Sequence, residues 1–356
     1  MLQELIDKAR EEFKLPGIDS GRCVHALVES ASCRACVDAC PRGAWRLDDE
    51  SLGIDTACCD GCGLCVPVCP EGALSHDYAP APRHWKGRPL AYAACERTGP
   101  AGSTGVIPCL HAIGLQTLLR LHRDGHRTLI IAAGDCEDCP RGITTRLNQR
   151  VDSLNAMLDS RGMPRMALRL LPGDKWRAMF AGSNPGDTGH RTGRRSFLRR
   201  VAGRGVAQGM KTAGIGESGD ETYRPPSTLL PRASANDVLV CVPTIRPDHC
   251  NGCDACARLC PHHAIEIQDE DDRGVAYRIH AERCTGCGIC HDACDREAVF
   301  VERDIPQTQL RVKLGRGRCR SCGAPYHLPV AAAGADTLCR ICARTNHNRN
   351  LYQVLD

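Results

Sequence analysis

The chain has 356 residues, enough for two or three domains, with a formal charge of +4 and only 4% aromatic residues. Its 26 cysteines mostly stand two or three residues apart, which disfavours disulfide bonds and suits metal chelation. The charge is too small to indicate nucleic acid by itself, and no apolar run is long enough to predict a membrane span. Because the N-terminus lacks the apolar stretch of a signal peptide, we expect a cytoplasmic protein with reduced cysteines.

The N-terminal segment, residues 1–22, predicts a helix. Its first part, MLQELIDKAREEFKL, is rich in charge and has a helical pattern. We expect this helix to precede the metal-binding part of the chain, which begins at Cys23.

The first metal-binding module is predicted over residues 23–85. Cys33, Cys36 and Cys40 fit the last three cysteines of the iron–sulfur motif C-x2-C-x2-C-x3-C-P, and Pro41 follows Cys40. The first cysteine of that motif would fall at position 30, which is Ser30. Either a more distant cysteine completes the site, or the site has only three thiolate ligands.

The same motif recurs three more times along the chain. The further copies occupy residues 58–74, 250–265 and 284–299, so four copies form two widely separated pairs. The short spacing turns the chain tightly enough to place three thiolates on three corners of one 4Fe–4S cluster, and the fourth cysteine ligates the other cluster of the pair. Residues 23–75 and 247–302 thus each resemble the two-cluster module of bacterial ferredoxins.

This resemblance implies four 4Fe–4S clusters, each held by three cysteines of one copy and one of its pair. The expected ligand sets are Cys59, Cys62, Cys65 and Cys40; Cys250, Cys253, Cys256 and Cys294; Cys284, Cys287, Cys290 and Cys260; and Cys33, Cys36 and Cys69 with Cys23.

The assignment of Cys23 has an alternative. Cys23 lies ten residues before Cys33, so it must loop back to act as the fourth ligand. Otherwise it is a buried thiol beside a three-iron or open-site cluster. Cys58, next to the ligand Cys59, has the wrong spacing and is expected to be a spare thiol.

The middle segment, residues 86–181, predicts an α/β domain. Apolar strands are expected near residues 89–94, 128–134 and 166–171, with amphipathic helices over 110–125 and 143–162 between them. A β-α-β-α-β order favours a small parallel sheet with right-handed crossovers. Ligands of such sheets collect at the carboxyl ends of the strands.

Four cysteines stand at or near those strand ends, and they are Cys95, Cys109, Cys136 and Cys139. With the sequence IIAAGDCEDCPRG they resemble the delta-type iron–sulfur subunit of methyl-viologen- and deazaflavin-reducing hydrogenases, which partners heterodisulfide reductase. The resemblance implies a 2Fe–2S cluster, although the strand-end cysteines of that family stand farther apart. Two alternatives remain: a redox-active dithiol at Cys136 and Cys139, and unligated or zinc-binding cysteines.

A Gly/Pro/Ser-rich stretch over residues 182–236 predicts a basic linker. Its most basic part, residues 192–200, is a solvated segment or a docking arm for an acidic partner. The linker leads to the second ferredoxin-like module, predicted over residues 237–305, in which Cys241 is expected to be a buried strand thiol.

The C-terminal segment, residues 306–356, predicts a zinc-ribbon-like pair of knuckles. Its cysteines follow the pattern C-x2-C-x16-C-x2-C, which delivers four thiolates tetrahedrally, and they are Cys319, Cys322, Cys339 and Cys342. We expect one Zn²⁺, and a rubredoxin-like iron site needs the same geometry. The segment is basic, but few aromatic residues interleave the charges, so protein docking is favoured over nucleic acid.

These motifs favour a multidomain α+β and α/β protein that carries electrons. The sequence contains no Gly-rich dinucleotide fingerprint, no nucleophile–base pair and no haem-attachment motif. We therefore expect a polyferredoxin that relays single electrons between a redox subunit (a hydrogenase, formate dehydrogenase or heterodisulfide-reductase-like flavoprotein) and another carrier. The alternatives are an enzyme that reduces a disulfide or sulfur compound at Cys136 and Cys139, and an iron–sulfur sensor or assembly protein.

Overall fold

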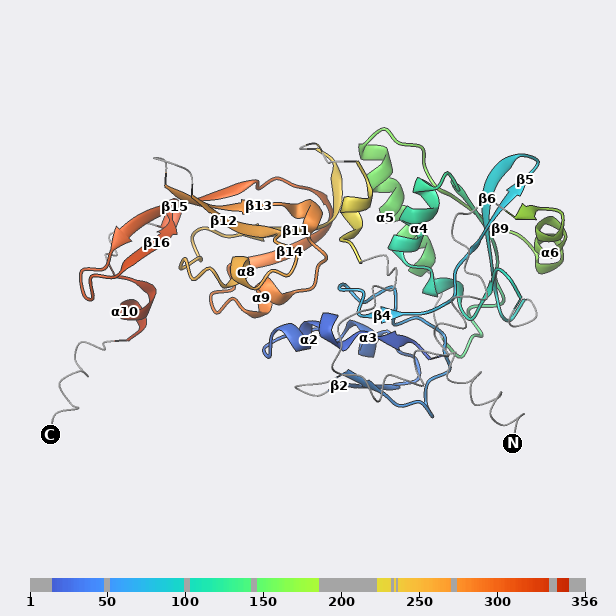
Figure 1. Cartoon of the computed structure of the whole chain (residues 1–356), viewed down its shortest axis with the longest axis horizontal. Coiled ribbons are helices and arrows are strands. Elements are labelled where there is room, and N and C mark those ends of the chain that lie inside the picture. The colour runs from blue at the N-terminus through green and yellow to red at the C-terminus, as the bar shows by residue number, and fades with distance from the viewer. Residues whose placement is uncertain are drawn as a thin grey trace, which may run out of the picture.

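The computed structural model of the chain describes residues 15–47, 52–98, 103–141, 146–185, 223–231, 234, 236–269, 274–332 and 338–345. Figure 1 shows the first module in blue beneath the green helices of the α/β region. The second module, in orange, lies on the other side of these helices from the strands of the α/β region, and the C-terminal segment, in red, extends from the far end of the second module.

The middle region is built on a six-stranded sheet of order β10-β5-β6-β8-β9, with β7 beside β6. Strands β6, β8 and β9 are parallel, as predicted, while β5 pairs antiparallel with both β6 and β10. The elements of this region are β5 (Ala81–Trp85), β6 (Arg88–Cys95), β7 (Val106–Ile107), α4 (Leu115–Arg123), β8 (Thr128–Ala132), α5 (Arg146–Ser160), β9 (Ala167–Leu170), α6 (Gly173–Ala181) and β10 (Asn184–Pro185).

Helices cover both faces of this sheet. On one face, Leu118 of α4 and Leu154 of α5 are fully buried in the larger apolar core. On the other face, Trp176 of α6 packs edge-on to Tyr92, and its indole N–H donates to the carbonyl of Ile130 at 3.2 Å. The predicted β-α-β-α-β order is confirmed, whereas β5, β10 and α6 were not predicted.

The helix predicted over residues 110–125 is divided in two. The 3-10 turn η2 (Leu110–Ala112) ends at an extended Ile113, and α4 begins only after Gly114, whose ψ is 164°. A Cβ on Gly114 would lie 3.1 Å from Pro67 of the first module. The break therefore lies where the two regions pack closely.

Both ferredoxin-like modules follow one plan. Two terminal strands pair antiparallel, and a hairpin separates the two cysteine motifs. In the first module these elements are β1 (Gly17–Ile18), η1 (Ser20–Arg22), α2 (Val24–Leu27), α3 (Ala35–Asp38), β2 (Trp45–Leu47), β3 (Leu52–Ile54) and β4 (Leu74–Ser75). In the second they are β11 (Val238–Ile245), α8 (Ala255–Arg258), β12 (Ile265–Asp269), β13 (Val275–Ile279), η5 (Ala281–Arg283), α9 (Ile289–Asp292) and β14 (Val299–Pro306).

The C-terminal segment continues the second module. Strand β15 (Arg311–Arg318) pairs with β13, and β16 (Pro325–Pro329) pairs with β15, giving a sheet of order β12-β13-β15-β16. The described part of the segment also contains η6 (Val330–Ala332) and α10 (Arg340–Arg344).

Two predicted segments differ in the structure. Of the expected helix over residues 1–22, residues 1–14 lie outside the described part; its later residues form β1 and η1 instead, because β1 pairs with β4. Of the predicted linker, residues 186–222 lie outside the described part, including the basic stretch 192–200. Its end is packed as η3 (Pro226–Leu229), in which Pro226 and Ser227 are buried.

Among the helices in the described part of the chain, none is long and apolar enough to cross a membrane.

Candidate metal centres

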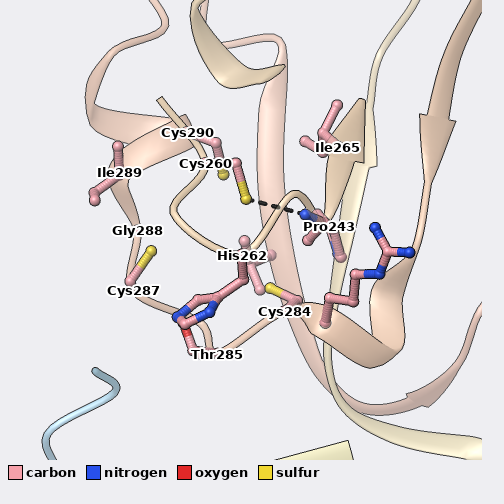
Figure 2. Close-up of a pocket in the computed structure, with 13 residues that line it drawn as sticks. Pro243, Cys260, His262, Ile265, Cys284, Thr285, Cys287, Gly288, Ile289 and Cys290 are labelled. Atoms are coloured by element: carbon pink, nitrogen blue, oxygen red, sulfur yellow. Dashed lines mark hydrogen bonds between the residues drawn. The ribbon is translucent and has the colours of Figure 1, made fainter. Parts of the chain in front are cut away.

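One four-thiol site lies in the second module. Figure 2 shows the side chains of Cys260, Cys284, Cys287 and Cys290 around one cavity of about 360 Å³. Cys284 follows η5, Cys290 lies in α9, and Cys260 comes from the other motif of the module. The structure therefore gathers the four cysteines that the motif pairing predicts.

Several residues in the cysteine loops of this module adopt the left-handed backbone conformation, with positive φ. Gly286 has φ +76°, and a Cβ there would lie 2.6 Å from the Sγ of Cys241. Gly288 has φ +85° at the start of α9, and Asp254 takes the corresponding position before α8 with φ +66°. Asp254 holds this strained conformation through hydrogen bonds to Tyr277 at 2.8 Å and His327 at 2.7 Å.

The second site of this module is lined by Cys250, Cys253, Cys256 and Cys294, beside Tyr277. Burial is the largest cause of the raised pKa of Cys256, and the neighbouring thiols of Cys290 and Cys250 add to it. Thiolates in such a place need compensating positive charge, and iron supplies it.

In the first module, Cys40, Cys59, Cys62 and Cys65 line a further cavity with Asp60 and Trp45. Burial raises the pKa values of Cys62 and Cys65 to about 12. This set again joins three cysteines of one motif to one of its pair.

The displaced Cys23 lies with the remaining thiols of the first module. The pKa of Cys36 is raised to about 12 by burial and then by the thiols of Cys69, Cys33 and Cys23. Cys23 ends η1 with φ −66° and ψ 137°, and Cys284 ends η5 in nearly the same conformation. Cys23 thus occupies the structural position of a first motif cysteine.

The register of the strands gives the same position for Cys23. The number of residues from the end of β1 to Cys23 equals the number from the end of β11 to Cys250. The amide of Asp19 donates to Ala73, as that of Arg246 donates to Ala298. Helix α2 is therefore an insertion between the first and second cysteines of the motif, which explains why Ser30 stands where the sequence pattern expects a cysteine.

A repeated hydrogen bond supports the fourth cysteine of each motif. The amides of Ala44, Ala264 and Ala298 donate to the sulfurs of Cys40, Cys260 and Cys294 at 3.4, 3.2 and 3.3 Å. Burial raises the pKa of Cys69, and backbone N–H groups that include that of Ala73 oppose this effect. Such donors stabilise a thiolate ligand and tune a bound cluster.

The middle-region cysteines also share one cavity. Cys95 ends β6, Cys109 follows β7, and Cys136 and Cys139 follow β8. Arg97 and Arg141 are among the other residues that line the cavity. Burial raises the pKa of Cys136. For Cys139, burial acts in the same direction, but the amide of Arg141 and the guanidinium of Arg97 outweigh it and lower the pKa.

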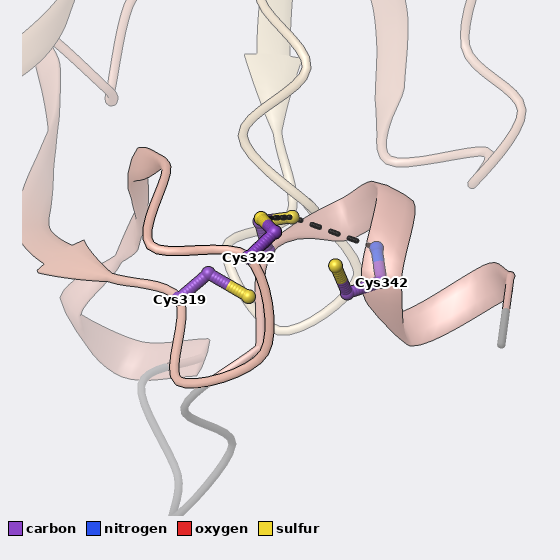
Figure 3. Close-up of side chains that lie close together, drawn as sticks. Cys319, Cys322 and Cys342 are labelled. Atoms are coloured by element: carbon purple, nitrogen blue, oxygen red, sulfur yellow. Dashed lines mark hydrogen bonds between the residues drawn. The ribbon is translucent and has the colours of Figure 1, made fainter. Parts of the chain in front are cut away.

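The C-terminal cysteines form a much tighter group. The sulfurs of Cys319, Cys322, Cys339 and Cys342 all lie within 4.8 Å of one another (Figure 3). One tetrahedral ion with Zn–S bonds of about 2.3 Å holds its sulfurs about 3.8 Å apart. Hydrogen bonds, first from the amide of Cys339, lower the pKa of Cys319 to about 6, which favours the thiolate. The donor set therefore fits one metal ion.

The other thiol sites are more open. Within the described residues, no second group of three or more Cys, His, Asp or Glu ligand atoms lies within 4.8 Å. Their four-thiol cavities are thus too wide for a single tetrahedral ion and fit a polynuclear cluster better.

Several nearby residues do not line these sites as ligands. Cys58 is exposed. Cys241 is fully buried in β11, as predicted, and its thiol hydrogen-bonds with Cys284. The sequence analysis predicted neither this contact nor the role of Glu71, whose carboxylate hydrogen-bonds with His262 and Thr285. Glu71 directly follows the proline of a cysteine motif, and this position was the one signal that could have indicated it.

Comparisons with known proteins agree with this geometry. A model of the 4Fe-4S dicluster domain matches residues 249–298, and a model of the 4Fe-4S binding domain matches residues 52–75. The chain carries ferredoxin-type 4Fe–4S domains. They point to an iron–sulfur electron-transfer role. Comparison with curated proteins gave no match.

Proposed function

We propose that this protein is a polyferredoxin that passes single electrons between a redox enzyme subunit and another carrier. The observation that carries the proposal is the repeated four-thiol cavity, which occurs in both modules beside a second group of four cysteines. A bound 4Fe–4S cluster gains or loses one electron without breaking a bond. The buried cysteine loops provide the fixed, low-dielectric surroundings that such exchange needs.

Four 4Fe–4S clusters account for all the thiols of the two modules except those of Cys58 and Cys241. The ligand sets are those expected from the motifs, with Cys23 as the fourth ligand beside Cys33, Cys36 and Cys69. Proximity of these thiols and the equivalent position of Cys23 support that set. At the C-terminus the tight four-sulfur group supports one Zn²⁺.

A fifth redox centre is proposed in the middle region. Its four thiols adjoin the first module, where Cys109 packs with Cys62 and Leu64 in one buried cluster. Arg141 joins the two regions: it pairs with Asp60 at 2.9 Å and Glu96 at 3.0 Å and donates to the carbonyl of Pro108 at 2.6 Å. A 2Fe–2S centre here, as in the delta-type hydrogenase subunits, would exchange electrons with the first module. The proposed partner is a hydrogenase, formate dehydrogenase or heterodisulfide-reductase-like subunit.

A second candidate function has one specific observation in its favour. The thiol of Cys139 has a lowered pKa and that of Cys136 a raised one, the asymmetry of a dithiol that attacks and then resolves a disulfide. On this alternative the middle region reduces a disulfide or sulfur compound with electrons from the modules.

Anaerobic purification followed by iron, sulfide and zinc analysis tests the proposal. We expect about 16 iron atoms per chain from four 4Fe–4S clusters, or about 18 with a 2Fe–2S centre, and one zinc. EPR spectra of the reduced protein should show interacting clusters. Near-zero iron overturns the electron-relay function. Rapid alkylation of Cys139 in iron-loaded protein would instead favour the dithiol alternative.

A further inference from the structure

The two ferredoxin-like modules touch through equivalent loops. Glu71 follows Cys69 and Pro70 in the first module, and His262 follows Cys260 and Pro261 in the second. The carboxylate of Glu71 accepts a hydrogen bond from Nε2 of His262 at 2.7 Å. Each loop therefore carries one proposed cluster ligand, and a single hydrogen bond joins the two loops.

Further contacts hold these two loops together at the junction, by which we mean the contact between Glu71 and His262. The hydroxyl of Thr285, next to Cys284, donates to the second carboxylate oxygen of Glu71 at 2.6 Å. Glu71 is only 5% exposed, and His262 and Thr285 lie together at one edge of the site in Figure 2. On the same interface, the amide and hydroxyl of Ser32 donate to Asp292 at 2.8 and 2.9 Å.

Tyr223 closes the junction from the segment that leads to the second module. Its hydroxyl donates to the carbonyl of Pro70, and its ring lies 6.4 Å from that of His262, centroid to centroid. The guanidinium of Arg22 lies over the Tyr223 ring, 5.1 Å from its centroid. A Cβ built on Gly72 would lie 2.2 Å from the same ring, so the loop after Cys69 is packed without spare room.

We infer that the contact between Glu71 and His262 is the route by which the two modules exchange electrons, connecting the site of Cys69 to the site of Cys260. This inference rests on the proposed function. One site loses one electron and the other gains it, and no bond is made or broken. Glu71 and His262 are positioning residues that hold the two ligand loops together.

The chain offers a matched pair of variants for this test. Gly72 and Gly43 occupy the same place in their motifs, with φ +58° and +59°. An alanine has the same backbone strain at both positions, but only at Gly72 does it collide with Tyr223, since nothing lies within 4 Å of a Cβ at Gly43. Gly72→Ala should therefore open the junction, and Gly43→Ala should leave it closed.

The exposed thiol of Cys58 supplies a defined entry point for the electron. A ruthenium polypyridyl photoreductant attached there, with a sacrificial donor, reduces the first module of the iron-loaded full chain upon a flash. Freeze-quench EPR then follows the arrival of the electron in the second module. Signals are assigned beforehand from Cys62→Ser and Cys256→Ser variants.

We expect fast reduction of both modules in the unmodified protein and in Gly43→Ala. In Gly72→Ala the first module should still be reduced quickly, while the fast phase of the second module is lost. Equal rates in all three proteins overturn the inference. If neither module accepts an electron, the proposed function itself fails, so the two failures are distinguishable.

Glu71→Ala is the second variant, used if Gly72→Ala does not retain its iron. It removes the hydrogen bonds to His262 and Thr285 without adding bulk. It should also abolish the fast phase of the second module at an unchanged iron content, and an unaltered fast phase again overturns the inference.

Discussion

The two ferredoxin-like modules share a cysteine plan but differ in what surrounds it. In the first module, β1 and β4 have two residues each, and the buried members of its apolar cluster are Trp45, Cys65 and Leu74. In the second module, β11 and β14 have eight residues each, and the core includes Tyr277 and Leu314 from a four-stranded sheet. The same site chemistry is therefore supported by a larger apolar core in the second module than in the first.

Removal of iron should produce the largest difference in stability between the two modules. Without clusters, the first module loses the metal that holds its cysteine-rich core, and we expect it to unfold. The second module should keep its hairpin and the strands of its sheet, because their apolar burial does not depend on metal. Hydrogen exchange of the protein before and after anaerobic chelation measures this difference. Equal loss of protection in both modules would show that their cores are equivalent.

The second prediction concerns the insertion that sets the first module apart. Cys23→Ser should leave three thiolates at the site of Cys33 and Cys36, so that one iron corner is lost and a three-iron EPR signal appears in the oxidised protein. The thiol of Cys58 is exposed, and Cys58→Ser is the matched control with unchanged iron. A full iron content in Cys23→Ser would remove Cys23 from the ligand set.

A third difference is that the described part of the C-terminal segment packs against the second module. Arg340, between two of the C-terminal cysteines, donates to the carbonyl of Cys253 at 2.8 Å, and Arg344 pairs with Asp295 at 2.8 Å. A Cβ on Gly252 would lie 2.0 Å from the carbonyl oxygen of His327. A metal ion at the C-terminal site would therefore hold α10 against the site of Cys250, Cys253, Cys256 and Cys294.

Loss of that metal should expose the adjoining site to oxygen. We expect Cys322→Ser to lose zinc and to release iron from the second module several-fold faster in air, with the first module unchanged. Arg320→Ala, at an exposed neighbouring residue, is the control. Iron analysis and EPR during exposure to air follow the reaction. Release at the same rate from both modules would contradict a protective role for α10.

The sequence could predict the motif pairs because local spacing controls how a short loop presents its cysteines. It also predicted the parallel strands β6, β8 and β9, whose apolar runs are long and separated by helices. It could not predict β1, a two-residue strand that forms only because β4 lies opposite. Nor could it predict the junction at Glu71 and His262, residues 191 positions apart whose contact depends on how the modules pack.

The smallest expected effect lies on the redox potential of one cluster in the second module. Cys241 of β11 hydrogen-bonds with Cys284. With a cluster bound, Cys284 is a thiolate, so the Cys241 S–H becomes the donor. Such a donor stabilises the reduced, more negative state.

Cys241→Ala should therefore lower the potential of the cluster at Cys284. Cys241→Ser, which keeps a hydroxyl donor in the same place, should restore most of the difference. Potentiometric titration followed by EPR measures both variants, and the first-module clusters of the same sample are the internal reference. Because Cys241 also packs beside Gly286, equal shifts in the two variants would mean that packing, rather than hydrogen bonding, sets the potential.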